Sequence, residues 1–132
     1  MSKIVINTRD ELTMLETSLV AVVKANGNYC TVHYINKREI LLTMPISRVD
    51  EMLKRYNNEH DKFIKLGRSI IINQRYIYRI DLQRELMFLS DGGPADRDLV
   101  VKLGKGLLKP YKNAIVASIK ITNQRIQNNK EK

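Results

Sequence analysis

Several residue types that often define a chemistry are scarce in this chain. Its 132 residues include no tryptophan, a single cysteine and two histidines. Cys30 has no partner for an internal disulfide, as is usual in the reducing cytoplasm, and one thiol with two distant imidazoles, His33 and His60, does not make a metal site. No long uncharged apolar run is present, and residues 1–11 lack the apolar core of a signal peptide. We therefore expect a cytoplasmic protein with no membrane span, no metal and no other cofactor.

Catalytic signatures are also missing. Gly104 and Gly106 form a lone Gly-x-Gly pair without the remainder of either nucleotide-binding fingerprint. Cys30 and His33 lie three residues apart in a predicted strand, and this odd spacing projects them to opposite faces, against a catalytic dyad. The sequence therefore predicts that the protein is not an enzyme and has no small-molecule substrate.

Positive charge is present in excess and is concentrated at one end. The formal net charge is +9, and the segment 99–132 holds most of the surplus, with eight Lys or Arg residues and one acidic residue. Such a local surplus suits a polyanionic partner, nucleic acid before an anionic membrane. A solvated basic tail without a partner is the alternative.

Strand patterns dominate the chain. Short runs rich in β-branched and aromatic residues, or alternating between apolar and polar ones, predict strands. These runs cover residues 3–7, 11–15, 19–23, 29–35, 38–43, 84–90 and 99–103. The segment 25–28 contains the pair Asn26-Gly27 and predicts a hairpin turn. The count of short strands indicates a mainly β domain.

Two segments have helical spacing instead. After Pro45, which suits a first helical turn, apolar residues recur at helical spacing as far as Tyr56. A second helix is predicted over 105–117, and Pro110 either starts it or bends it. Its expected apolar face comprises Leu107, Leu108, Tyr111 and Ile115. We expect one domain over 1–117 and a basic, polar, flexible tail over 118–132.

The stretch Phe63–Asp81 carries the most specific pattern. It opens with an apolar-charged alternation, turns at a Gly-Arg-Ser corner (67–69) and continues into three consecutive isoleucines (70–72). A second alternating run follows Gln74. The isoleucine run predicts a strand buried on both faces, so we expect two strands that meet near Gln74. We expect Asn73 to have a structural turn role between them, with DNA contact as its alternative.

This pattern resembles the signature of the LytTR-type DNA-binding domain of bacterial transcription regulators. The residues that carry the resemblance are Phe63-Ile64-Lys65, Arg68-Ser69, Ile70 to Ile72, Asn73 and Tyr76-Ile77. The Gly-Asn-Tyr segment at 27–29 is also similar to the family, and the likeness extends over roughly 4–115. The chain departs from the family pattern at Gly67, where the family usually has His, and at Gly104-Lys105, where it often has Ser-Arg.

The resemblance implies a fold and a binding mode. The implied fold is mainly β, with antiparallel sheets of about ten short strands, one short internal helix and a C-terminal helix. In the family, loops rather than a recognition helix enter the DNA grooves. Carried over by motif position, the contact candidates in this chain are Asn28, Tyr29, Arg68, Ser69 and Lys105.

Each candidate has a chemical argument and a structural alternative. Arg68 offers a planar fork of donors to guanine or phosphate, or it is a surface residue at a strand end. Asn28 can read adenine, or it shapes its turn. Tyr29 and Ser69 can bond phosphate, or they pack across a hairpin and stabilise a corner. Lys105 begins a predicted helix and suits phosphate, or it is solvated surface.

These patterns predict sequence-specific binding of duplex DNA by strand-connecting loops, in a regulator of bacterial transcription such as the effector domain of a response regulator. Both a homodimer and tandem copies on repeated sites are compatible with this prediction. The alternative is a protein-interaction module that keeps the fold and has lost DNA binding, which the departures at Gly67 and Gly104-Lys105 suggest. RNA binding is a third interpretation, but aromatic residues are only 6% of the chain and no stacking motif is present.

Overall fold

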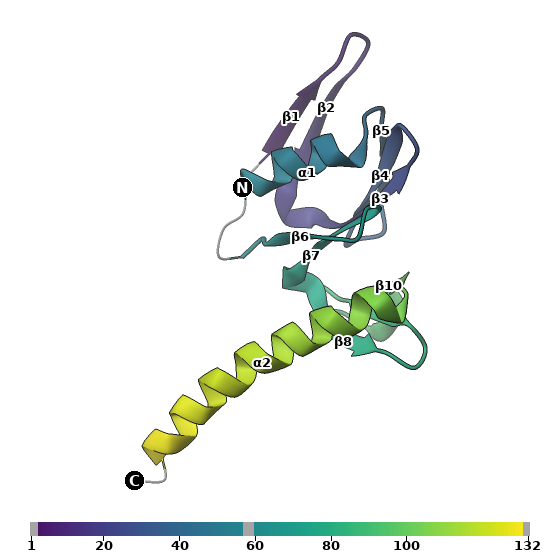
Figure 1. The fold of residues 1–132 in the computed structure, drawn as a ribbon. Coiled ribbons are helices and arrows are strands. Elements are labelled where there is room, and N and C mark those ends of the chain that lie inside the picture. Colours follow the sequence, from purple (N-terminus) through teal and green to yellow (C-terminus); the bar gives the residue numbers. More distant parts are fainter. Residues whose placement is uncertain (1–2, 57–59, 131–132) are drawn as a thin grey trace. The chain divides into compact units, whose positions relative to one another are not determined.

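The computed structural model describes residues 3–56 and 60–130, with side chains described as far as residue 119 (Figure 1). The chain divides into two compact units. The first unit contains residues up to Arg79 together with Phe88–Val100, and the second contains Ile80–Met87 and the residues from Val101 onward. Each unit is described by itself.

Ten strands and two α-helices are found in the described residues, so the expected mainly β fold is confirmed. In chain order the elements are β1 (Lys3–Asn7), β2 (Leu12–Glu16), β3 (Val20–Asn26), β4 (Tyr29–Tyr34), β5 (Glu39–Leu42), α1 (Ile46–Lys54), β6 (Phe63–Leu66), β7 (Ile70–Asn73), β8 (Ile77–Asp81), β9 (Leu86–Leu89), β10 (Leu99–Lys102) and α2 (Lys105–Lys130). Short 3-10 helices lie at Thr17–Leu19, Gln74–Tyr76 and Ala95–Arg97.

The centre of the first unit is a five-stranded antiparallel sheet. Its strand order is β5-β4-β3-β7-β6. The registers pair Val23 with Val32 on one side and with Ile71 on the other. The side chains of Ile71 and Ile72 point to opposite faces of β7 and both are fully buried, while Ile70 is half-buried. The prediction that the isoleucine run is buried on both faces is therefore confirmed.

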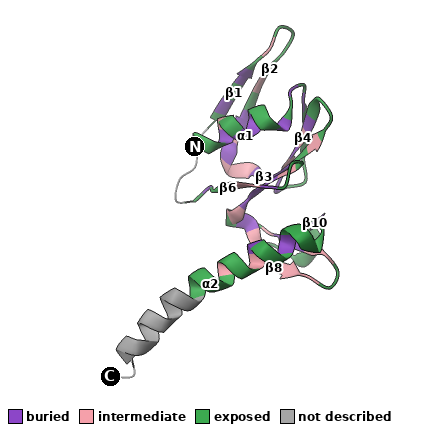
Figure 2. Cartoon of the chain, viewed as in Figure 1, coloured by how far each residue is buried: buried purple, intermediate pink, exposed green. Residues whose placement is uncertain are grey.

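The β1–β2 hairpin and α1 build the main hydrophobic core against this sheet. Ile4, Ile6 and Leu15 from the hairpin belong to the same buried cluster as Val49 and Leu53 from α1. Helical spacing puts the apolar residues of α1 on one side, which is buried, while the opposite side is exposed (Figure 2). The outer face of the hairpin remains exposed at Val5, Leu12 and Met14.

Asn73 ties the end of β7 to the start of β3. Its side chain is completely buried; its amide donates to the backbone oxygen of Val20 at 2.9 Å and to Asp61 Oδ1 at 3.2 Å. Its Oδ1 accepts from the backbone N–H of Arg75 at 3.1 Å, which caps the 3-10 helix that follows. Three residues after Asn73, Tyr76 donates a hydrogen bond from its hydroxyl to the backbone oxygen of Ser18. The structural role predicted for Asn73 is confirmed.

The second unit contains the loop that joins β8 to β9 and the helix α2. Arg84 closes the loop by bonding Asp81, with Nε 2.7 Å from the carboxylate. On α2, Leu108 and Tyr111 are buried and Ile115 is half-buried, in the order that helical spacing predicts. The strands β8, β9 and β10 form a three-stranded sheet in the order β10-β9-β8.

Several predicted boundaries are wrong. The turn expected at 25–28 is shorter, because Ala25 and Asn26 remain paired with β4 and extend β3 beyond its apolar run. Pro45 precedes α1 with an extended backbone instead of lying in its first turn. The helix expected to end at residue 117 continues to Lys130. Leu107 was expected on the apolar face of α2 and is exposed. Whether residues 118–132 are flexible stays a prediction.

Cys30 is expected to be chemically inert in the folded protein. Its thiol is fully buried, and burial raises its pKa from 9.0 to about 11. A raised pKa keeps the thiol protonated at pH 8, where the thiolate fraction should be about 100-fold below that of an exposed thiol. Reaction with a chromogenic disulfide reagent should therefore be slow in buffer and fast in concentrated urea. Equal rates in the two conditions would contradict the burial of this residue.

Candidate nucleic-acid interface

The turn between β3 and β4 exposes Asn28 and Tyr29. Gly27 occupies the first central position with φ of +65°, and Asn28 has no positive φ, which is the pattern of a type II′ hairpin turn. The closing pair is Asn26 with Tyr29. Tyr29 is 50% exposed and lies on the face of β4 opposite to Cys30. The turn therefore presents an amide and a phenol to solvent, and neither contributes to the core.

The turn between β6 and β7 exposes Arg68 and Ser69. Gly67 supplies a φ of +66°, a conformation that glycine adopts without strain. All three turn residues are exposed, so the guanidinium is available to an external acceptor. The alternative of a surface arginine at a strand end is compatible with the same geometry.

These two turns lie at the same end of the five-stranded sheet. The backbone N–H of Ala25 donates to the backbone oxygen of Ser69 at 2.8 Å, immediately beyond the Lys24–Ile70 pair of the β3–β7 register. Segments that are about forty residues apart in sequence are thus joined directly. Four of the five residues that the sequence analysis selected, Asn28, Tyr29, Arg68 and Ser69, belong to this sheet end.

Sequence reasoning missed a further cation at this end. Lys24 is exposed, and in the sheet it lies between Thr31 and Ile70. Its positive charge acts on His33. The pKa of His33 is lowered mainly by burial and to a smaller extent by the charge of Lys24. The predicted strand ended at residue 23 and the predicted turn began at residue 25, so the local pattern placed Lys24 beside the first turn only. The pairing of β3 with β7 places it beside the second turn as well.

Lys105 belongs to the second unit, where the start of α2 already has an acidic neighbour. The backbone N–H of Lys105 donates to Glu85 Oε2 at 2.9 Å. Glu85 adopts a positive φ of 59° in the β8–β9 loop, and its backbone oxygen accepts from Leu103 at 3.0 Å. A carboxylate therefore occupies one of the helix N-terminal donors that a phosphate would use. The expectation that these backbone donors attract phosphate is wrong for this N–H; the exposed ammonium of Lys105 remains available.

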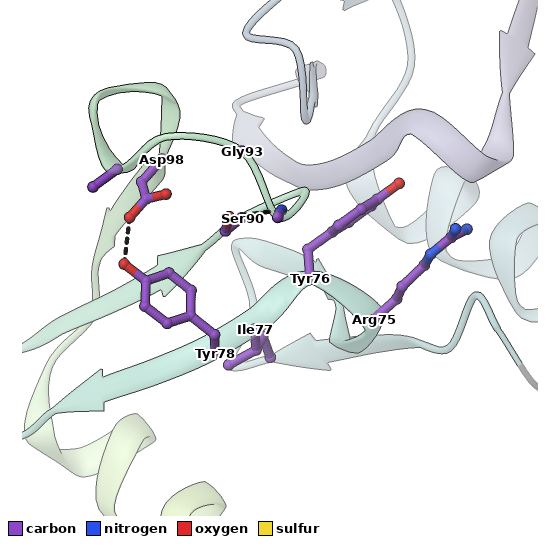
Figure 3. A pocket seen from close by; sticks show the side chains of 9 residues that line it. Arg75, Tyr76, Ile77, Tyr78, Ser90, Gly93 and Asp98 are labelled. Atoms are coloured by element: carbon purple, nitrogen blue, oxygen red, sulfur yellow. Dashed lines mark hydrogen bonds between the residues drawn. The ribbon is translucent and has the colours of Figure 1, made fainter.

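A hollow of about 470 Å³ lies on the first unit beyond the far end of β7. Figure 3 shows the side chain of Tyr78 directed at Asp98, to which its hydroxyl donates. This hydrogen bond is the main reason that the pKa of Tyr78 is raised. The hydroxyl of Ser90 accepts from Gly92 N–H at 2.9 Å. Polar side chains that line the hollow are thus engaged in hydrogen bonds within the protein, and we assign no ligand to it.

Comparison with known proteins gives a family. Residues 10–95 match the family model described as the LytTr DNA-binding domain, which is more than half of the chain. The chain belongs to the LytTr DNA-binding domain family. The turn candidates Asn28, Tyr29, Arg68 and Ser69 fall within the matched residues of this LytTr domain, whereas Lys105 lies outside them. The similarity estimated from motifs, which extended to about residue 115, is therefore longer than the family match.

A solved structure shares the LytTr fold. The LytTr DNA-binding domain of a protein named as a putative methyl-accepting/DNA response regulator from Bacillus cereus is 17% identical in sequence and superposes with a TM-score of 0.55, covering 87% of this chain and 97% of that chain. At this identity the likeness concerns the fold. A comparison with curated protein sequences gave no match.

Neither helix is long and apolar enough to cross a membrane within the part of the chain that the structure describes. The described residues also contain no group of three or more His, Cys, Asp or Glu side chains that could hold a metal ion.

Proposed function

We propose that this LytTr domain binds specific sites on duplex DNA through its strand-connecting turns and thereby regulates transcription in bacteria. The residues that would contact DNA are Asn28 and Tyr29 in the β3–β4 turn, Arg68 and Ser69 in the β6–β7 turn, and Lys105 at the start of α2. The observation that carries the proposal is the Ala25–Ser69 hydrogen bond, which holds the two turns together at one sheet end.

The chemistry of this sheet end divides the roles among these residues. Arg68 has the geometry to bond the O6 and N7 atoms of guanine with two donors. Asn28 can bond the N6 and N7 edge of adenine in the same way. Tyr29 and Ser69 each supply a hydroxyl for a phosphate oxygen, and Lys24 adds a charge beside them. Base recognition and backbone anchoring would thus come from one rigid edge, so their relative positions are set before DNA binds.

Selection from a random duplex library, followed by fluorescence anisotropy across a salt series, tests the proposal. The selected duplex should bind more tightly than a scrambled duplex, single-stranded DNA or RNA. Its affinity should fall steeply with salt, because neutralising phosphates releases counterions, with a log–log slope of about −0.9 per phosphate contact. Absence of binding even at low salt would replace this proposal with the protein-interaction alternative. Equal or tighter RNA binding would contradict the preference for duplex DNA.

Replacing Lys105 with alanine should weaken binding to all duplexes by a similar factor. A lysine ammonium on a flexible side chain acts as a point charge on phosphate and does not read bases in two-donor geometry. The salt slope should become shallower by about 0.9, as expected for one lost phosphate contact. The matched control is Lys37→Ala, since Lys37 is also exposed but bonds the backbone oxygen of Asp96 at 3.2 Å. A loss confined to the selected sequence would contradict the phosphate role of Lys105.

A further inference from the structure

Within the described residues, no strand pairs with the outer edge of β1. β1 and β2 form a two-stranded sheet, so β1 has a strand neighbour on one side only. The backbone oxygen of Lys3 points to the outer side, where it accepts from the hydroxyl of Tyr56 at 3.3 Å. Its cross-strand partner Glu16 likewise points outward and donates its N–H to Tyr34. Lys3 and Glu16 are therefore a non-hydrogen-bonded pair of the antiparallel ladder.

The same alternation determines the orientation of Val5. It lies two residues after Lys3 and pairs with Met14, so its N–H and C=O also point away from β2. Its side chain is 58% exposed, and that of Met14 is 56% exposed. Val5 thus offers a backbone donor, a backbone acceptor and an apolar surface to whatever lies along this edge.

A groove runs along this edge. It has a volume of about 530 Å³ and is bounded by β1 on one side and by the C-terminal end of α1 on the other. Three consecutive β1 residues, Lys3, Ile4 and Val5, line it together with Met52, Arg55 and Tyr56. Met52 and Tyr56 are half-buried, so the floor is largely apolar, while Arg55 is exposed at the rim.

Charge identifies the kind of occupant. Arg55 follows the last helical residue of α1, where its full positive charge outweighs the partial negative charge of the helix end, about half an elementary charge. Lys3 adds a second cation, although Glu16 across the hairpin offsets it in part. We propose that this groove binds an extended acidic peptide from a partner protein, which adds a third strand to the hairpin along β1.

The features of the groove specify the peptide. Its backbone would pair with the N–H and C=O of Val5, and alternate apolar side chains would pack beside Val5 and over Met52. A carboxylate would reach Arg55. Duplex DNA could bind the same cations, but it cannot extend a β-sheet or pack apolar side chains on the floor of the groove. The observations therefore favour a peptide.

The groove is separate from the proposed DNA-contacting turns. β5 ends at Leu42, which pairs with Cys30 at the turn end of the sheet, and α1 begins four residues later. Arg55 lies beyond the last of nine helical residues, about 14 Å along the helix axis. Figure 1 shows the final turn of α1 beside the start of β1. Variants in the groove should therefore retain DNA binding.

Selection of phage-displayed random octapeptides on the full 132-residue chain tests this inference. The enriched peptides should alternate apolar residues with Asp or Glu. Amide signals of Val5, Met52 and Arg55 should shift when a selected peptide is added to isotope-labelled protein. Failure to enrich acidic peptides, or shifts located elsewhere, would overturn the proposal. Equivalent shifts of these amides on addition of duplex DNA would also overturn it, since the groove would then be a nucleic-acid surface.

Three variants make the test specific. Val5→Pro removes the outward N–H without touching the β1–β2 ladder, and should weaken the selected peptides about tenfold, the usual effect of losing a hydrogen bond of this kind. Met14→Pro is the matched control, because it removes an outward N–H from β2, on the other edge, and should leave affinity unchanged. Arg55→Glu keeps the backbone intact and should select basic peptides instead. Equal peptide affinity of the Val5 and Met14 variants, or unchanged selection by the Arg55 variant, would contradict strand addition. All three should bind duplex DNA as the parent chain does, so failure here is distinguishable from failure of the proposed function.

Discussion

Replacing Arg68 with alanine is expected to weaken binding to the selected duplex by about 1–3 kcal/mol, which corresponds to a loss of roughly five- to 150-fold. Two donors of one guanidinium can bond two acceptors on the edge of a guanine, so a single substitution removes both bonds together. Binding to scrambled duplexes should weaken much less. The chain should therefore lose its preference at one position of the site, as measured by repeating the selection with the variant.

The matched control for Arg68 is Arg38→Ala. Both arginines are exposed and both lie in segments that connect neighbouring strands of the same sheet, but the segment around Arg38 joins β4 to β5 at the end opposite to Arg68. The two substitutions change the net charge equally, so a purely electrostatic effect would be similar in both. An unchanged sequence preference in the Arg68 variant would remove this residue from the base-reading set and leave it as a phosphate contact or surface residue.

Replacing Asn73 with alanine should lower the free energy of unfolding by about 3 kcal/mol. The amide group makes three hydrogen bonds inside the first unit, to Val20, Asp61 and Arg75. Truncation removes the side-chain donor to the backbone oxygen of Val20 and one donor to the buried carboxylate of Asp61, which keeps its ion pair with Arg75. Equilibrium urea unfolding measures the loss as a lower midpoint with an unchanged slope.

Two further substitutions separate the hydrogen bonds of Asn73 from the loss of any asparagine side chain. Asn7→Ala, at an exposed position of β1, should change stability by no more than about 0.5 kcal/mol. Asn73→Asp keeps the acceptor for Arg75 but places a second carboxylate beside Asp61, so its deficit relative to the parent should shrink as pH falls and one carboxyl is protonated. A deficit of the same size at the two positions 7 and 73 would contradict the structural role of Asn73.

The sequence alone was sufficient for the element types and for most of their limits. β-branched density and alternation are local signals, and they placed β4, β6 and β7 at or within one residue of their observed positions. The buried isoleucine run and the structural asparagine were also predicted from local signals, because strand burial and turn formation depend on the types of neighbouring residues. Signals failed where pairing with another strand extends an element beyond its apolar run, as in β3, whose last two residues pair with β4.

Only the tertiary structure decided which residues lie together. The strand order brings Ser69 beside Ala25 and adds Lys24 to that sheet end, and no local pattern encodes a strand order. The same holds for Glu85, whose carboxylate bonds the N–H of Lys105 from twenty residues away. It holds also for the groove, because a free strand edge exists only once every other pairing is known. Sequence periodicity reports which face of an element is buried; long-range pairing determines which side chains share a surface, and binding depends on the surface.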